Sequence, residues 1–282
     1  NQGSINSINN AGTIQSNNRA IHNRDTISSL TNTNLITAAY FTIYNVGTLG
    51  TITNSGTISA SLGFAISNVY GNIESIINTS TGEINSASDT IVNGSGRSIT
   101  SLINQGDIDA SADAAILNNG TISTINNSGN IYATEGIGIE NDGASATITN
   151  LTNSGNISAG TAISNTTGSI ETITNTGSIS SLTSLADIHN NGSINMLINR
   201  QSNLTFTGNL PANYQIMIAS TSNYGKITFS DVTGTNIFGI HATSSVNENT
   251  TYTSVITGIS DSELSTTTGT FIDEGVIAMT GH

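Results

Sequence analysis

The chain contains no cysteine and no tryptophan, and it has one proline among its 282 residues. Without cysteine, disulfides and thiolate-bound metals are excluded. No apolar stretch approaches the ~20 residues that a membrane-spanning helix requires. The lack of cysteine suits a secreted chain that must cross membranes unfolded, and it suits a reducing compartment equally well.

Basic residues are also scarce. Lys and Arg together number 5 against 18 acidic residues, which gives a net charge of −13. Binding to nucleic acid or to an anionic membrane surface depends on clustered basic residues. The composition therefore argues against both kinds of partner, and we expect the thinly spread acidic residues to serve solubility.

Asn, Ser, Thr, Ile and Gly make up most of the chain. Charged residues account for 8% of it and hydrophobic residues for 35%. The β-branched residues Ile and Thr favour strands, whereas Asn and Gly favour turns. This composition predicts an all-β fold with many polar turns.

One eight-residue pattern recurs along the chain. "SINNAGTI" at 7–14 returns as "TITNSGTI" at 51–58, "TINNSGNI" at 124–131 and "TITNTGSI" at 172–179. Asparagines aligned on this pattern form a first series: Asn10, Asn32, Asn54, Asn78, Asn104, Asn127, Asn153, Asn175 and Asn199. A second series lies between them: Asn23, Asn45, Asn68, Asn93, Asn118, Asn141, Asn165 and Asn190.

The period of 22–26 residues, with two Asn marks in each period, limits the possible repeat architectures. Leucine-rich repeats need closely spaced Leu, helical repeats need apolar residues at helical spacing, and propeller blades need longer, aromatic-marked units. The period fits a right-handed parallel β-helix of about nine coils, each with three short strands separated by bends. We predict this solenoid over residues 1–203.

Alternation within the pattern places the Asn residues on the inner side of each coil. Ile125, Asn127, Gly129 and Ile131 share one face of an extended chain. A buried Asn needs partners for its amide and its carbonyl, and an Asn one coil away supplies both. We therefore predict that both series form inward ladders. We expect the Gly that follows each Asn to tolerate the backbone angles of the bend.

The pattern stops near residue 203, and residues 204–282 form a predicted C-terminal capping region. This region holds Pro211, Lys226 and most of the aromatic residues. The segments "YQIMIAS" (214–220) and "KITFSDV" (226–232) alternate on either side of a turn, which predicts an antiparallel β-hairpin cap. Such a cap would cover the last coil of the solenoid.

The passage from a Ser/Thr/Asn/Gly-rich β-helix into "NYQIMI", "NYGKITFSDV" and "YTSVITGI" resembles a bacterial autotransporter (type V secretion) passenger running into its pre-barrel, autochaperone-like region. The resemblance implies a location on the bacterial cell surface or in the medium, with anchoring through an outer-membrane barrel outside this sequence. Because the repeat is already under way at residue 1, we expect the chain to be part of a longer protein.

Acidic residues provide one weak metal candidate. Asp107 occupies the position of Glu83 one coil earlier, with Asp109 nearby, so these outward carboxylates could share a Ca²⁺ ion. A solvated acidic patch is the plainer interpretation. β-helix enzymes need clustered carboxylates with Arg or Lys nearby, and the sequence predicts no such cluster, no nucleophile elbow and no zinc motif. We expect no enzyme activity and no cofactor.

These observations favour a structural and interaction protein. We expect a surface-exposed rod that mediates adhesion or cell–cell aggregation through its polar ridges and loops. Its partner would be a host-cell or bacterial-surface protein or glycan, or a second rod, without nucleic acid and without direct membrane insertion. The alternative is a passive stalk that presents an N-terminal enzyme domain, a protease or an esterase, preceding residue 1.

Overall fold

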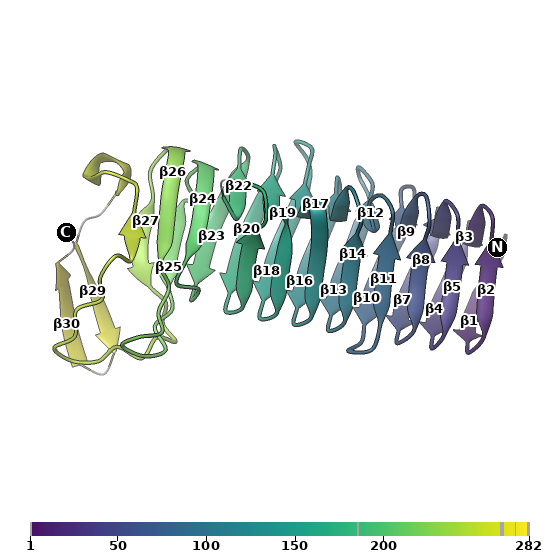
Figure 1. Cartoon of the computed structure of the whole chain (residues 1–282), viewed down its shortest axis with the longest axis horizontal. Helices are drawn as coiled ribbons and strands as arrows, with labels where there is room; N and C mark the ends of the chain where they lie inside the picture. Colours follow the sequence, from purple (N-terminus) through teal and green to yellow (C-terminus); the bar gives the residue numbers. More distant parts are fainter. Residues whose placement is uncertain (1, 185, 266–267, 274, 281–282) are drawn as a thin grey trace.

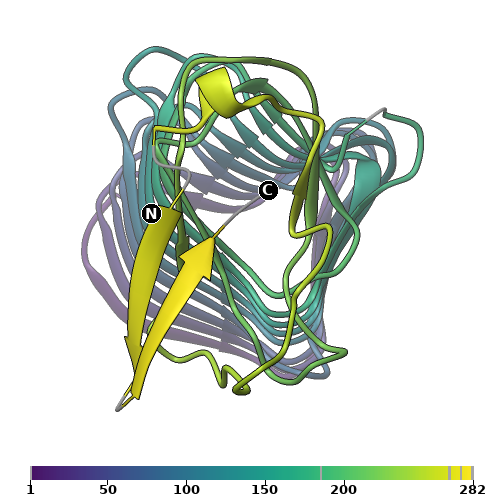
Figure 2. The ribbon, with the colours of Figure 1, turned by 90° about the vertical axis from the view of Figure 1, so that its left-hand side faces the viewer.

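The computed structural model describes residues 2–184, 186–265, 268–273 and 275–280. The chain winds into coils that stack in sequence order along one axis (Figure 1). Strands of successive coils pair in parallel, for example β4 with β7 and β10 with β13. The fold is the all-β parallel solenoid that the repeat predicts, and viewed along its axis the coils superimpose on one another (Figure 2).

The coils have up to three strands, which define three faces of the rod. The first face is an 11-stranded sheet: β1 (Ile5–Asn10), β4 (Thr26–Asn32), β7 (Thr48–Asn54), β10 (Asn72–Asn78), β13 (Ser98–Asn104), β16 (Thr121–Asn127), β18 (Thr147–Asn153), β20 (Ser169–Asn175), β23 (Ser193–Asn199), β25 (Asn213–Ile216) and β27 (Ile237–Ile240).

The second face is shorter: β2 (Thr13–Ser16), β5 (Leu35–Ala38), β8 (Thr57–Ala60), β11 (Glu83–Ser86), β14 (Asp107–Ala110), the first parts of β17 (Asn130–Asn141) and β19 (Asn156–Asn165), and β21 (Ser178–Ser181). The third face comprises β3 (Arg19–Asn23), β6 (Phe41–Asn45), β9 (Phe64–Asn68), β12 (Ile91–Asn93), β15 (Ala114–Asn118), the second parts of β17 and β19, β22 (Ile188–Asn190), β24 (Leu204–Asn209), β26 (Ile227–Thr233) and β28 (Ile256–Thr257).

Identical residues of the repeat stack in register between coils. On the first face Ile99 lies between Ile73 and Ile122, and Asn104 lies between Asn78 and Asn127. These Ile side chains are buried and form part of one core cluster that runs along the rod. The strict register follows because a slip of one residue would turn the Ile side chains to solvent.

The predicted antiparallel hairpin at 214–232 is wrong. β25 pairs in parallel with β23 and β27, and β26 pairs in parallel with β24 and β28. Antiparallel contact is confined to the turn between the two segments, where Ile218 and Tyr224 form an isolated bridge. Alternation determines which side chains are buried, but it does not determine strand direction, and each strand here pairs with a coil that is already in place. Parallel stacking therefore continues across residue 203, and the division into two domains stays a prediction.

The second face ends at β21, so later coils have two strands rather than the predicted three. Gln201 occupies the place of the missing strand. Its Oε1 accepts a hydrogen bond from Ile179 N at 2.8 Å, and its Nε2 donates to Ile179 O at 2.8 Å. The side-chain amide thus satisfies both backbone groups that a further strand would have satisfied.

Aromatic side chains fill the core of these two-stranded coils. Phe206 and Phe229 lie in register with ring centroids 5.5 Å apart, and Tyr214 packs edge-on against Phe229 at 6.2 Å. All three side chains are essentially fully buried. The change of composition near residue 203 therefore marks a change in how the core is filled, not a change in strand topology.

Beyond the last coil lie η1 (Asp261–Glu263) and an antiparallel pair, β29 (Thr268–Asp273) with β30 (Gly275–Thr280). This pair lies at the C-terminal end of the rod (Figures 1 and 2). The β-hairpin of the C-terminal region is therefore present, at 268–280 rather than at the predicted 214–232.

Candidate functional site

The first Asn series forms one continuous chain of hydrogen bonds inside the rod. Nδ2 of each Asn donates to Oδ1 of the Asn in the next coil, at 2.8–3.2 Å from Asn10 to Asn199. All nine side chains are buried. The sequence-derived partners and the observed partners are the same.

The second series makes an equivalent chain along another edge of the core. Nδ2 donates to Oδ1 of the next coil at 2.7–2.9 Å from Asn23 to Asn190. The donor lies in the N-terminal coil of every pair in both chains, so the amide dipoles align and reinforce one another.

Most ladder amides have a second acceptor in the next coil, the backbone carbonyl of the first residue of a strand. Asn127 Nδ2, for example, donates to Asn156 O at 3.1 Å. At the C-terminal ends of the ladders, backbone carbonyls take over: Asn190 Nδ2 donates to Asn209 O at 2.6 Å, and Asn199 Nδ2 donates to Gln201 O at 2.8 Å. The ladders thus leave no last amide unpaired.

Most glycines that follow the ladder Asn residues are needed for space rather than for backbone angles, which differs from the prediction. A Cβ on Gly129 would lie 2.1 Å from Gly106 O, and a Cβ on Gly155 would lie 2.2 Å from Gly129 O. None of these three has a positive φ, whereas Gly143, which follows ladder Asn141, has a φ of 104° and fits the prediction. Close approach of neighbouring backbones is the reason for glycine here.

The candidate Ca²⁺ residues lie together on the second face. Glu83 and Asp107 are paired in register, and Asp109 lies two residues further along β14. Glu83 Oε1 accepts a hydrogen bond from Asn85 Nδ2 at 2.6 Å, and Asp107 Oδ1 accepts one from Asn130 Nδ2 at 2.8 Å. Burial, followed by the charges of Glu83 and Asp107, raises the pKa of Asp109. Within the described part of the chain, no three acidic or His side chains are arranged to hold a metal ion.

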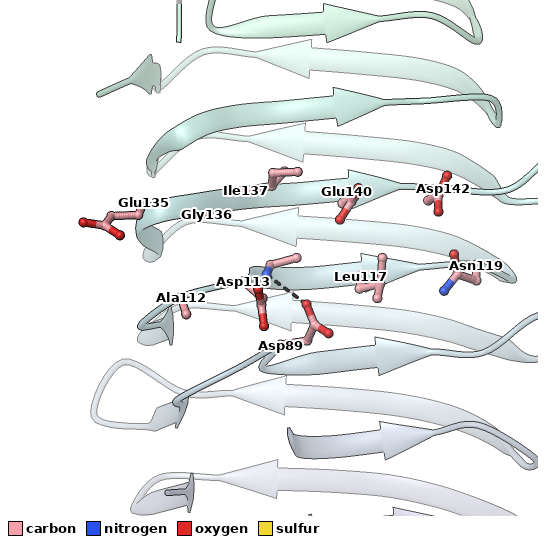
Figure 3. A pocket seen from close by; sticks show the side chains of 11 residues that line it. Asp89, Ala112, Asp113, Leu117, Asn119, Glu135, Gly136, Ile137, Glu140 and Asp142 are labelled. Carbon is pink, nitrogen blue, oxygen red and sulfur yellow. Dashed lines mark hydrogen bonds between the residues drawn. The ribbon is translucent and has the colours of Figure 1, made fainter. Parts of the chain in front are cut away.

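A second acidic group, which the sequence analysis missed, lies on the third face. A hollow of about 560 Å³ opens over β15 and the second part of β17, with Asp89 of the preceding coil at its edge (Figure 3). We call it the acidic hollow, and its lining includes Asp89, Asp113, Leu117, Glu135, Ile137, Glu140 and Asp142. Asp89, Asp113 and Glu140 lie in three successive coils, and only the stacking of coils brings them together.

Two carboxyl groups of the acidic hollow are half-buried beside other acids. Burial raises the pKa of Asp89, and the charge of Asp113 adds to this effect, while the backbone N–H of Ala114 opposes it by donating to Asp89 Oδ1 at 2.9 Å. Burial also raises the pKa of Glu140, with Asp142 contributing the largest charge effect. The acidic hollow therefore concentrates negative charge that no cation among its lining residues offsets.

Aromatic residues gather on the same third face, nearer the N-terminus. Phe41 and Phe64 are in register with Arg19, and the rings of Phe41 and Phe64 lie edge to face at 5.6 Å. The Arg19 guanidinium lies 4.3 Å from the ring centroid of Tyr44 and 5.4 Å from that of Phe41. Such cation–π contacts hold a cationic group at the surface beside the rings.

Large exposed apolar side chains border this cluster on both sides. Tyr40 is 50% exposed, Leu62 62% and Tyr70 59%. The first two precede β6 and β9, and Tyr70 follows β9. We call the set the aromatic patch, and it comprises Arg19, Tyr40, Phe41, Tyr44, Leu62, Phe64 and Tyr70. The sequence "AAYFTIY" (38–44) carries the signal for it.

Comparison of the chain with protein-family models, with curated proteins and with solved structures found no match. In the described residues, no helix has the length and apolar character needed to cross a membrane. Functional inference therefore depends on the geometry of the rod.

Proposed function

We propose that this chain is a surface-exposed rod of the autotransporter passenger kind, which mediates adhesion or cell–cell aggregation. The observation that carries the proposal is the aromatic patch, an exposed apolar surface on a rod whose outer positions are otherwise mostly Asn, Ser and Thr. A contiguous exposed apolar patch marks an interaction site in soluble proteins.

The internal structure supports a binding role that needs a rigid scaffold. Two Asn ladders and a continuous Ile core run through the coils, and the outer residues can vary without disturbing either. A rigid surface loses little conformational entropy on binding. The rod would present the aromatic patch and its polar ridges to a protein or glycan on a host or bacterial cell.

The proposal is tested by displaying residues 1–282 on bacteria through a heterologous outer-membrane barrel. We expect displaying cells to aggregate or to adhere to host material more than cells that display the barrel alone. The double variant Tyr40→Ser/Leu62→Ser should lose this gain. Leu182→Ser is the matched control, because Leu182 is similarly exposed (49%) and also precedes a third-face strand.

Equal behaviour of displaying cells and barrel-only cells would contradict the proposal. That outcome would favour the passive stalk, whose uniform ladders and buried core also suit a spacer that holds another domain away from the membrane.

A further inference from the structure

The aromatic patch lies beside two cations that have no acidic partner within the described residues. Arg19 and Arg24 are two of the 5 basic residues in a chain with 18 acidic residues, and both belong to the coil of β3. In that part of the chain, neither guanidinium forms an ion pair with a carboxylate. The nearest acid in the sequence, Asp25, accepts a hydrogen bond from Thr26 Oγ1 at 3.3 Å instead. The N-terminal end of the third face thus combines an exposed apolar surface with unpaired cations.

Contacts with neighbouring rings hold both cations in place. The Arg19 guanidinium lies over the rings of Tyr44 and Phe41, and its Nε is buried without a hydrogen-bond partner among the described residues. The exposed Arg24 donates from Nε to His22 Nε2 at 3.2 Å, and the His22 ring packs edge-on against Tyr44 at 5.2 Å. Cations that are ordered before binding lose less conformational entropy when a partner binds.

We propose that the aromatic patch and Arg24 together bind an acidic segment of a partner protein, in which apolar side chains lie next to Asp or Glu. This inference rests on the proposed function, and it names the chemistry of the partner. Arg19 and Arg24 determine specificity by pairing with carboxylates of the segment, because a planar guanidinium matches a carboxylate. The exposed side chains of Tyr40, Leu62 and Tyr70 contact the apolar residues of the segment.

The residue types of the patch favour a protein segment over a glycan. Leu62 is its most exposed side chain, at 62%, and an aliphatic side chain has no ring face on which a sugar can stack. Tyr, Phe and Arg are enriched in protein interfaces, where an apolar centre usually has a polar rim. Leu62 precedes β9 whereas Arg24 follows β3, so the apolar and the charged groups are separated across the face. A complementary partner has the same separation.

The acidic hollow determines the direction in which the segment lies. Asp89, at the edge of the acidic hollow, precedes β12, which pairs with β9. A carboxylate over β9 would lie one coil from β12, about 5 Å along the axis, whereas a carboxylate over β3 would lie three coils away, about 14 Å. The longer distance exceeds the screening length of about 8 Å at physiological salt. The acidic residues of the segment therefore lie over β3, and its apolar residues lie over β6 and β9.

Titration of two synthetic peptides with the purified chain, up to about 1 mM, tests the proposal. The acidic peptide has Leu and Trp flanked on one side by Asp and Glu, and the basic peptide has Lys at every acidic position. Peptide Trp fluorescence reports binding, because the chain contains no Trp. We expect the acidic peptide to bind about fivefold more tightly or better, with a Kd that rises with NaCl concentration. Tyr40→Ser/Leu62→Ser should raise that Kd by about fivefold or more, and Leu182→Ser should leave it unchanged.

Charge reversal at Arg24 tests the specificity. Arg24→Glu should abolish or reverse the preference for the acidic peptide, because the new carboxylate repels that peptide and attracts the basic one. The Arg24 side chain is exposed, so the change does not disturb the core. Lys226→Glu is the matched control, because it changes the net charge equally but lies just before β26, far from the patch. We expect this control to keep the wild-type preference, and far-UV circular dichroism confirms that each variant is folded.

Three outcomes would overturn the proposal: equal binding of the acidic and the basic peptide, an unchanged preference in Arg24→Glu, or tighter binding of a carboxylate-bearing oligosaccharide such as a hyaluronan fragment. Displaying cells whose adhesion is lost with Tyr40→Ser/Leu62→Ser but kept with Arg24→Glu would leave the proposed function standing and remove only this inference.

Discussion

Replacement of Asn127 by Asp tests the physical basis of the rod. Asn127 lies mid-ladder, where its Oδ1 accepts from Asn104 Nδ2 at 2.8 Å and its Nδ2 donates to Asn153 Oδ1 at 2.8 Å and to Asn156 O at 3.1 Å. Asp keeps the acceptor but loses both donors. The buried Asn153 Oδ1 and the half-buried Asn156 O then lose this donor.

The cost depends on the protonation of the new carboxyl group. Leaving buried acceptors unpaired costs about 1–3 kcal/mol. At neutral pH an ionised carboxylate would also face two oxygens in a buried site, so we expect a loss of about 3 kcal/mol or more. Burial raises the pKa of such an Asp above its unfolded value, so this extra cost is fully present above the folded pKa, shrinks as pH falls between the two pKa values, and is absent below the unfolded pKa.

Urea unfolding followed by far-UV circular dichroism, at neutral and at mildly acidic pH, measures this loss. Asn126→Asp is the matched control, because Asn126 is the preceding residue and its side chain is exposed. We expect the control to change the free energy of unfolding by less than about 0.5 kcal/mol. Equal losses for the two variants, or a loss at Asn127 that does not depend on pH, would refute the buried-ladder argument.

Three further predictions concern packing, charge and the end of the second face. Gly129→Ala should destabilise the fold by about 1–3 kcal/mol in urea unfolding, because the new Cβ would clash with the backbone of the preceding coil. Gly12→Ala is the control and should be nearly neutral, because a Cβ at that position has no atom within 4 Å. Asp109→Asn should stabilise the fold at pH 7 by up to about 1 kcal/mol after solvent screening, because burial and neighbouring carboxylates raise the pKa of Asp109 above its unfolded value. The gain should shrink as pH falls through the raised pKa and vanish below the unfolded pKa. Gln201→Leu should lower the free energy of unfolding by about 1–3 kcal/mol and speed amide hydrogen exchange at Ile179, whose N–H loses its acceptor. Unchanged exchange at Ile179 would contradict the conclusion that the Gln201 side chain takes the place of a strand.

The repeat predicts its own structure because every coil has the same pattern of residue types. Ile at alternate positions marks the inner side of each strand, and Asn at a constant place marks each bend. When such coils stack in parallel, identical residues meet, as Asn78, Asn104 and Asn127 do. The parallel solenoid and the partners of both ladders were therefore predictable from periodicity alone.

Sequence patterns were less informative where the repeat weakens. The alternation around Tyr214 and Phe229 indicates strands, but a parallel and an antiparallel arrangement bury the same side chains. The role of Gln201 was equally hidden, because nothing in the local sequence shows that a strand of the neighbouring coil lacks a partner. Long-range pairing decided both.

The surfaces on which the proposed function depends are likewise decided by long-range contacts. Asp89, Asp113 and Glu140 are separated by more than 20 residues at each step and gather only because coils stack. The sequence by itself determined the solenoid, its period and its Asn ladders, because these follow from contacts between equivalent positions. Only the tertiary structure decided where the second face ends, why Gly129 must be glycine, and that the aromatic patch and the acidic hollow share one face, because these depend on contacts between residues that are not equivalent.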